Sequence, residues 1–270
     1  MSADSGREDV KGWVTRGIAG ATLVFLVLPQ FILLIESFTA DNHLTFPPSR
    51  YGLRWYGYIL TDPDWVGALV RSMVVASVVT PLTVLIGLAA AFALDRGPRR
   101  GRRAIYTLLI APMILPHVVL GLGQFQIAFW THMQDTLAAY TLAHLTIALP
   151  YAIIIIGASL QVFDRRVEEA AQSLGAVPWR AVVYVTLPAL RPSLIATAIF
   201  AFITSFDEFI ITYLLSTRQV TIPIQIFNSL SFQLEPSVAA ISGLTLIVTA
   251  ALSGILIARG QLPGAPQAMR

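Results

Sequence analysis

Cysteine is absent from the 270 residues of this chain, and charged residues are scarce. Without cysteine there is no disulfide scaffold, no thiolate metal site and no cysteine nucleophile. The four histidines, His43, His117, His132 and His144, show none of the i,i+4 spacing expected of a helical zinc site. The sequence also lacks G-x-x-x-x-G-K followed by Ser or Thr, so we do not expect this chain to bind ATP itself.

Charged residues make up 12% of the chain, about half the share found in soluble domains, whereas 56% of the residues are hydrophobic. A soluble core of this size does not need so much apolar surface, but a chain dissolved in lipid does. We therefore expect an all-α integral membrane protein.

Six apolar segments are long enough to cross about 30 Å of hydrocarbon, which takes about 17–25 residues. They cover approximately residues 17–37, 68–94, 104–129, 137–160, 193–215 and 237–258. The first segment has basic residues before it, as a signal peptide does, but its length and its Pro29 and Gln30 favour a retained helix. We expect an N-terminus of residues 1–16, a single six-helix domain of residues 17–260 and a tail of residues 261–270.

The Lys and Arg residues predict the orientation of these helices. Fourteen of the 18 fall on one set of alternate loops, together with both termini, and four fall on the other set. Cytoplasmic loops carry such an excess of Lys and Arg. Both termini are therefore expected in the cytoplasm.

An external segment, residues 38–67, is polar and rich in aromatic residues. Its rings are Tyr51, Trp55, Tyr56, Tyr58 and Trp65. They could form an aromatic belt at the membrane interface or a docking surface for an external partner.

The loop of residues 161–191 has the pattern of two short cytoplasmic helices. Asp164 is a plausible N-cap, and Gly175 stands where a left-handed residue would end the first helix. Pro178 suits the first turn of a second helix, which Pro188 would close. An apolar stripe with i, i+3, i+4, i+7 spacing runs along one face of the first helix: Val167, Ala170, Ala171 and Leu174. This stripe could pack on the chain's own helix ends or insert into a groove on a partner.

The same loop resembles the EAA signature of ABC importer permeases, E-A-A-x3-G-x9-I-x-L-P, with Val185 in place of Ile. The matching residues are Glu169, Ala170, Ala171, Gly175, Leu187 and Pro188. The resemblance implies that this loop is a coupling helix, which docks in a cleft of an ATP-binding subunit and transmits its closure.

A second resemblance concerns the fifth segment. The residues Ser205-Phe206-Asp207-Glu208-Phe209 are similar to the S-F-D-D/E stretch of permeases for polyamines and related compounds. Residues 222–228 and 235–242 are similar to the external loop that enters the last helix of those permeases. The chain is most similar to the smaller permease subunit of the spermidine/putrescine-like importers.

Asp207 and Glu208 would lie within a membrane span, where acidic residues are costly and usually functional. In a continuous helix they could not share a face, whereas Thr204 and Glu208 could. At least one carboxylate could line a path for a cationic substrate. Alternatively, the acids could pair with a backbone donor or with an arginine such as Arg71 or Arg218. Nearby aromatic residues could supply cation–π contacts or simple packing: Phe206, Phe209 and Tyr213.

The family resemblance also implies the assembly. Its members share a MetI-like helical core, and two permease subunits lie in the bacterial plasma (inner) membrane above an ABC ATPase dimer. A substrate-binding protein works outside, ATP and Mg are bound by the ATPase subunits, and no nucleic acid is involved. The chain itself would then be no enzyme and need no cofactor; its other contacts are with membrane lipid.

Other functions remain open from the sequence alone. The same architecture could carry an aminophosphonate, an opine or an amino-acid-like solute. A stand-alone secondary transporter or channel would not need the two-helix loop. An intramembrane enzyme would need a catalytic pair that the sequence does not offer.

Overall fold

The computed structural model describes residues 5–232 and 235–258, so the expected tail of residues 261–270 lies outside the described residues. The described chain is helical apart from its loops and one isolated antiparallel bridge between Thr39 and Tyr51. It divides into two compact units, Met1–Asp62 with Asn228–Val248 and Pro63–Phe227 with Thr249–Arg270. The single six-helix domain of residues 17–260 stays a prediction.

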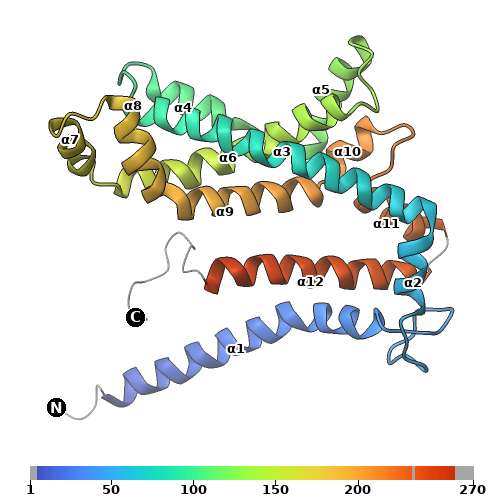
Figure 1. Ribbon diagram of the computed structural model, residues 1–270. Coiled ribbons are helices and arrows are strands. Elements are labelled where there is room, and N and C mark those ends of the chain that lie inside the picture. Colours follow the sequence, from blue (N-terminus) through green and yellow to red (C-terminus); the bar gives the residue numbers. More distant parts are fainter. Residues whose placement is uncertain (1–4, 233–234, 259–270) are drawn as a thin grey trace. The chain divides into compact units, whose positions relative to one another are not determined.

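The first unit contains α1 (Ser5–Glu36), α2 (Arg54–Thr61) and the first part of α12 (Ser237–Ala258) (Figure 1). Helix α12 packs closely against the end of α1 at Gly243, where a Cβ atom would lie 2.6 Å from Cβ of Ser37. The Tyr56 hydroxyl donates a hydrogen bond of 2.8 Å to Oγ of Ser37. The lack of a side chain at Gly243 thus permits this approach of two apolar helices.

The aromatic residues of the external segment do not share one environment. Trp55 and Trp65 are buried in protein, and the indole of Trp55 donates to the carbonyl of Asp41. Tyr51 and Tyr58 are exposed. The two tryptophans therefore cannot belong to a belt at the membrane surface or to a docking face.

The second unit is built on three long helices that lie side by side, α3 (Pro63–Arg96), α6 (Leu137–Val162) and α9 (Leu187–Phe206) (Figure 1). Val79, Ile156 and Leu190 are fully buried among them. Helices α3 and α6 meet closely where small residues face one another, since a Cβ on Gly87 would lie 2.5 Å from Cβ of Ala152.

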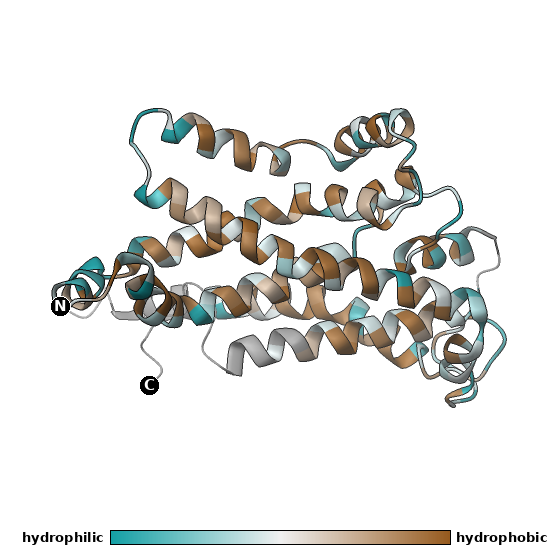
Figure 2. Cartoon of the chain, turned by 45° about the horizontal axis from the view of Figure 1, so that its top comes forward, coloured by the Kyte–Doolittle hydropathy of each residue, from teal (hydrophilic) through white to brown (hydrophobic). Residues whose placement is uncertain are grey.

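The apolar helices match most of the expected spans. Four helices of the described chain are long and apolar enough to cross a membrane: Thr15–Glu36, Pro63–Arg96, Leu137–Val162 and Pro178–Phe206. A fifth span results if the pair Arg102–Met113 and His117–Trp130 counts as one. Figure 2 shows these helices largely hydrophobic along their length and the loops largely hydrophilic.

The third and sixth expected spans are not among these four long helices. The third expected span is bent by 96° into α4 (Arg102–Ile110), the 3-10 turn η1 (Ala111–Met113) and α5 (His117–Trp130). Pro116 lies at this bend. It explains the interruption, because a proline disfavours helical backbone in the residue before it. Helix α12 has the same bounds as the sixth expected span. Its described apolar part, Ser237–Ala251, is shorter than the helices that could cross a membrane, so the count of six stays a prediction.

Pro188 does not close the second loop helix, contrary to the sequence prediction. Helix α8 (Pro178–Ala181) continues through a π-helical turn, η2 (Val182–Thr186), directly into α9. Pro188 lies in the first turn of α9. The wider π turn relaxes the i→i−4 pattern immediately before Pro188, which lets the chain pass the proline without ending the helix.

Candidate functional site

The first loop helix, α7 (Arg165–Ser173), begins and ends as its sequence predicts. Oδ1 of Asp164 accepts a hydrogen bond of 3.0 Å from the amide of Arg166 and so caps the N-terminus. Gly175 has a φ of +95°, and its amide donates to the carbonyl of Gln172. The amide of the following Ala176 donates to the carbonyl of Ala171, which completes a Schellman motif.

The apolar stripe of α7 faces away from its own unit. The side chain of Leu174 is 91% exposed and that of Val167 is 53% exposed. Ala170 is exposed, and Ala171 is half-buried. Of the two interpretations left open by the sequence, packing on the chain's own helix ends therefore fails for most of this stripe.

The residues of the EAA signature fall into two groups. Glu169, Ala170, Ala171 and Gly175 lie on α7 and its cap, with Glu169 exposed. Leu187 and Pro188 form the start of α9, beyond the π turn, and only Pro188 is exposed. The two groups belong to neighbouring elements because α7 contacts both α8 and η2.

Glu168, which the sequence did not single out, is buried beside this signature. Its carboxylate receives two hydrogen bonds from the guanidinium of Arg96 and one from the hydroxyl of Thr186. Burial raises the pKa of Glu168, but these hydrogen bonds outweigh it and hold the pKa below its usual range. No local sequence pattern indicates this contact, because Arg96 lies 72 positions before Glu168.

The second part of the site is a break in the fifth apolar segment. Helix α9 ends at Phe206 and α10 (Ile210–Leu215) begins after Phe209, so Asp207 and Glu208 lie in the break. The expectation that Thr204 and Glu208 share a helix face is therefore wrong. The break leaves backbone groups at the new helix ends that need partners.

Glu208 supplies one of those partners. Its Oε1 accepts a hydrogen bond of 2.7 Å from the amide of Ile211, and its Oε2 lies 3.4 Å from Nδ1 of His117, at the start of α5. The side chain is 6% exposed. A backbone donor was one expected alternative for this residue; an arginine partner was the other.

Neither expected arginine pairs with Glu208. The guanidinium of Arg71 donates to the carbonyl of Val220, and the amide of Arg218 donates to Asp135. Asp207 is exposed and has no hydrogen-bond or ion-pair partner for its carboxylate among the described residues. The two neighbouring acids thus have different surroundings, one satisfied within the chain and one open.

Three aromatic rings gather next to this break. The ring centroid of Phe209 lies 5.1 Å from that of Phe227 and 5.5 Å from that of Tyr213, and Tyr213 and Phe227 are 5.7 Å apart. Phe206, expected in the same group, instead stacks on Phe202 within α9. The cluster of Phe209, Tyr213 and Phe227 therefore starts at the break itself, with Phe209 two residues after Asp207 in the chain.

His144 holds the two sides of the break together. Its ring nitrogens lie 2.8 Å from Oγ of Ser205 at the end of α9 and 2.8 Å from Oγ1 of Thr212 in α10. The residue is buried, and both of its nitrogens have partners. His144 is therefore a hydrogen-bonded residue within the packed helices.

The loop after α10 is held by Asp135, in the short connection before α6. The backbone amides of Thr217, Arg218 and Gln219 donate to Oδ1 of Asp135 at 2.9, 3.2 and 3.3 Å, and the Thr217 hydroxyl donates to Oδ2. Partial burial raises the pKa of Asp135, but these donors lower it to about 2. Asp135 is therefore a charged loop clamp.

A metal site is not part of this arrangement. Within residues 5–232 and 235–258, no group of three or more His, Cys, Asp or Glu side chains could hold a metal ion.

The long apolar helices, one of them interrupted, define an integral membrane protein. Residues 83–259 match the family described as "Binding-protein-dependent transport system inner membrane component". The chain belongs to this family and is a permease subunit of an ABC importer.

Curated relatives agree with the polyamine-type resemblance seen in the sequence. The putrescine transport system permease protein PotI of Escherichia coli (strain K12) is 30% identical over 231 residues, 82% of each chain. The spermidine/putrescine transport system permease protein PotC of Haemophilus influenzae is 27% identical over 236 residues, 84% of this chain and 89% of its own.

Solved structures share the fold. A bacterial ABC transporter that imports the acidic polysaccharide alginate has a chain with a TM-score of 0.70 and 16% identity, covering 93% of this chain and 97% of its own. An amino acid ABC transporter has a chain with a TM-score of 0.58 and 19% identity, covering 76% and 96%. The same fold thus occurs in transporters of different solutes, alginate and amino acids.

Proposed function

We propose that this chain forms half of a translocation pathway for a polyamine or a related amine-bearing solute. In this proposal a second permease subunit forms the other half, and both termini lie in the cytoplasm. Hydrolysis of ATP takes place in a separate ATPase dimer. An external binding protein delivers the solute.

The open carboxylate of Asp207 carries the substrate part of the proposal. An acidic side chain within a membrane span is costly unless it is paired or serves transport. Asp207 is exposed and has no hydrogen-bond or ion-pair partner among the described residues, and Phe209 of the ring cluster follows it two residues later in the chain. A carboxylate beside aromatic faces suits an alkylammonium group, which gains both charge pairing and cation–π attraction.

The relatives support this choice of solute. The names of PotI and PotC specify putrescine and spermidine transport, and PotI is 30% identical over most of both chains. The alginate and amino acid transporters share the fold at lower identity, so they carry no argument about the solute.

The uncovered stripe on α7 supports the ATPase partner. Val167 and Leu174 present apolar surface on a nine-residue helix, which is too short to serve as a membrane anchor. An amphipathic helix of this kind is suited to a groove on another protein. The external binding protein is supported by the family description and by a related alginate transporter solved in complex with a periplasmic protein.

The test uses the whole complex in proteoliposomes, supplied with its binding protein. Putrescine, the uncharged analogue 1,4-butanediol, an aminophosphonate and an amino acid are compared as stimulators of ATP hydrolysis and as transported solutes. We expect stimulation and uptake with putrescine but not with butanediol. Stimulation by the aminophosphonate or amino acid alone would replace the polyamine proposal with a zwitterion importer.

A further inference from the structure

We infer that Arg96, Glu168 and Thr186 form a lock that makes the α7 loop move as one body with α3 and the start of α9. These three residues, here called the α3–α7 lock, would be positioning residues for energy coupling. The inference rests on the proposed role of α7 as the docking element for the ATPase.

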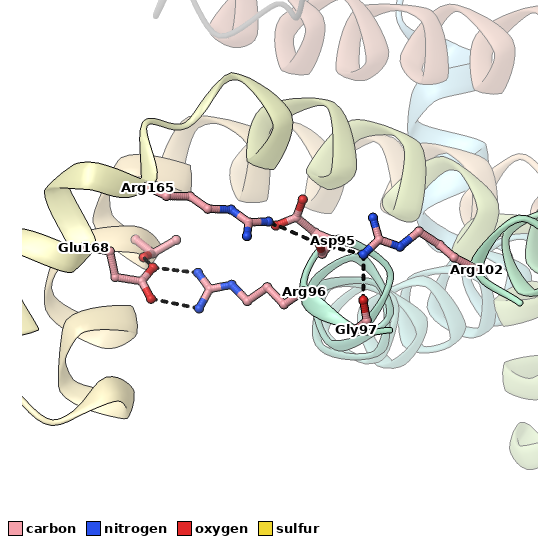
Figure 3. A network of polar contacts seen from close by, with 7 residues as sticks. Asp95, Arg96, Gly97, Arg102, Arg165 and Glu168 are labelled. Carbon is pink, nitrogen blue, oxygen red and sulfur yellow. Dashed lines mark hydrogen bonds and ion pairs between the residues drawn. The ribbon is translucent and has the colours of Figure 1, made fainter. Parts of the chain in front are cut away.

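The lock is a bidentate ion pair with a third ligand. Nη1 and Nη2 of Arg96 donate to Oε1 and Oε2 of Glu168 at 2.9 and 2.6 Å, and Oγ1 of Thr186 donates to Oε2 at 2.6 Å (Figure 3). The guanidinium of Arg96 also lies 4.6 Å from the ring centroid of Phe92. A guanidinium that makes two hydrogen bonds to one carboxylate fixes the relative orientation of the two side chains as well as their distance. A single exposed ion pair does not fix the orientation.

Burial makes this contact hard to break. The Glu168 side chain is 9% exposed and that of Arg96 is 30% exposed. Removing Arg96 would leave the buried carboxylate of Glu168 without its charge partner, which opposes separation of the pair.

The three residues come from three different elements. Arg96 ends α3, Glu168 lies in the first turn of α7, and Thr186 is the last residue of η2, immediately before α9. One carboxylate thus connects α7 to two of the three long helices of this unit. A force applied to α7 would reach both of them directly.

The exposed residues of the apolar stripe of α7 and the carboxylate of Glu168 lie on different sides of the helix. Successive helical positions are about 100° apart, so Val167 and Leu174 point about 100–120° away from Glu168, whereas Ala171 lies next to it at i+3. Val167 and Leu174 are exposed, whereas Glu168 is buried. A partner that covers the stripe therefore leaves the lock intact.

A second, exposed contact joins the same elements. Arg165, the first residue of α7, donates to the side chain and the carbonyl of Asp95, and Arg102 of α4 donates to the carbonyls of Asp95 and Gly97 (Figure 3). Arginines often bind the free carbonyls at a helix C-terminus in this way. These contacts fix the C-terminal end of α3, and with it the position of Arg96.

The first experiment measures coupling in the reconstituted complex. Solute uptake and ATP hydrolysis are followed in the same proteoliposomes for Arg96→Gln, Glu168→Gln, Thr186→Val and the exchanged pair Arg96→Glu with Glu168→Arg. We expect uptake per ATP to fall at least fivefold in Arg96→Gln and Glu168→Gln, less in Thr186→Val, and to recover by at least half in the exchanged pair. Arg166→Gln, which removes an exposed charge from the same helix, is the matched control.

The second experiment measures movement, and the natural absence of cysteine makes labelling simple. Spin labels at Ala93→Cys on α3 and Gln172→Cys on α7, both exposed positions, report the distance between these helices with and without ATP. The lock predicts one narrow distance distribution that nucleotide does not change, and a broadened one in Arg96→Gln.

The outcomes separate this inference from the proposed function. If Leu174→Asp uncouples transport but Arg96→Gln and Glu168→Gln leave uptake per ATP unchanged, the docking proposal stands and the lock is overturned. The same holds if the labelled distance changes with ATP in the wild-type background. If Leu174→Asp has no effect, the docking proposal itself fails.

Discussion

Nδ1 of His117 lies 3.4 Å from Oε2 of Glu208, and each residue stands at the interruption of an apolar segment. His117 is the first residue of α5, after the bend at Pro116, and Glu208 lies between α9 and α10. The two interrupted segments therefore meet at their breaks. Breaks in membrane helices are tolerated where they are buried in protein or line a cavity.

Glu208 is expected to matter for stability more than for the solute. Glu208→Ala removes the acceptor for the amide of Ile211, which costs about 1–3 kcal/mol at a buried site. Glu208→Gln keeps a carbonyl acceptor and should cost less. Apparent Tm of the purified complex checks this order. Unchanged Tm together with lost uptake in Glu208→Ala would place Glu208 in the pathway instead.

Asp207 is expected to behave in the opposite way. Asp207→Asn removes the open charge without removing a contact of the described chain, so assembly and Tm should be unchanged. Putrescine uptake should fall about tenfold or more, which corresponds to about 1.4 kcal/mol of lost interaction. Asp207→Glu, which keeps the charge, should retain most of the uptake. Full uptake by the Asn variant would refute a substrate role for this carboxylate.

Gly175 has a conformation that other residues rarely adopt. Nothing lies within 4 Å of a Cβ placed there, so the cost of Gly175→Ala comes from its φ of +95° alone and should be about 1–2 kcal/mol. We expect the end of α7 to fray and uptake per ATP to fall. Gly157→Ala, at a helical site with equally open surroundings, serves as control and should leave coupling intact.

Gly121 permits the contact between α5 and α10. A Cβ atom there would lie 2.6 Å from Cδ1 of Leu214 and 3.3 Å from Cα of Ile211, whereas a Cβ at Gly123 would meet nothing within 4 Å. Gly121→Ala should therefore lower the apparent Tm. Gly123→Ala should be neutral or stabilising, since alanine is favoured over glycine in helices by about 1 kcal/mol. Equal effects of the two variants would contradict this packing.

The Asp135 clamp gives a pH dependence with a definite sign. Because the pKa of Asp135 is lowered from 3.8 to about 2 on folding, its stabilisation is complete above about pH 4. It is lost as the pH falls from about 4 to about 2. Asp135→Asn should lower Tm by about 2–4 °C at neutral pH, for a loss of about 1 kcal/mol at this partly exposed site. The difference from wild type should shrink toward pH 2; a constant difference would contradict the clamp.

Local signals in the sequence were sufficient for much of the fold. Apolar length located the long helices, and Asp164 and Gly175 marked the ends of α7, because capping depends on residues within one turn of each other. The EAA signature likewise lies within 20 residues of contiguous sequence.

Contacts between distant segments could not be read in the same way. Arg96 and Glu168 are 72 positions apart, and no single-sequence pattern links them. The break at Asp207 was missed because the apolar runs on either side of Asp207 and Glu208 together have the length of one span. The π turn before Pro188 was missed because a proline ordinarily indicates a helix end.

The uninterrupted path through η2 has a mechanical consequence. Helix α8, the π turn and α9 form one rod, Pro178–Phe206, of 29 residues. At about 1.5 Å per residue such a rod is about 43 Å long, so a tilt of about 5° at the loop end displaces its far tip by about 4 Å. That tip is Phe206, next to Asp207. A small tilt of the rod at its loop end would therefore move Phe206, and with it the neighbouring carboxylate of Asp207, by more than the length of a hydrogen bond.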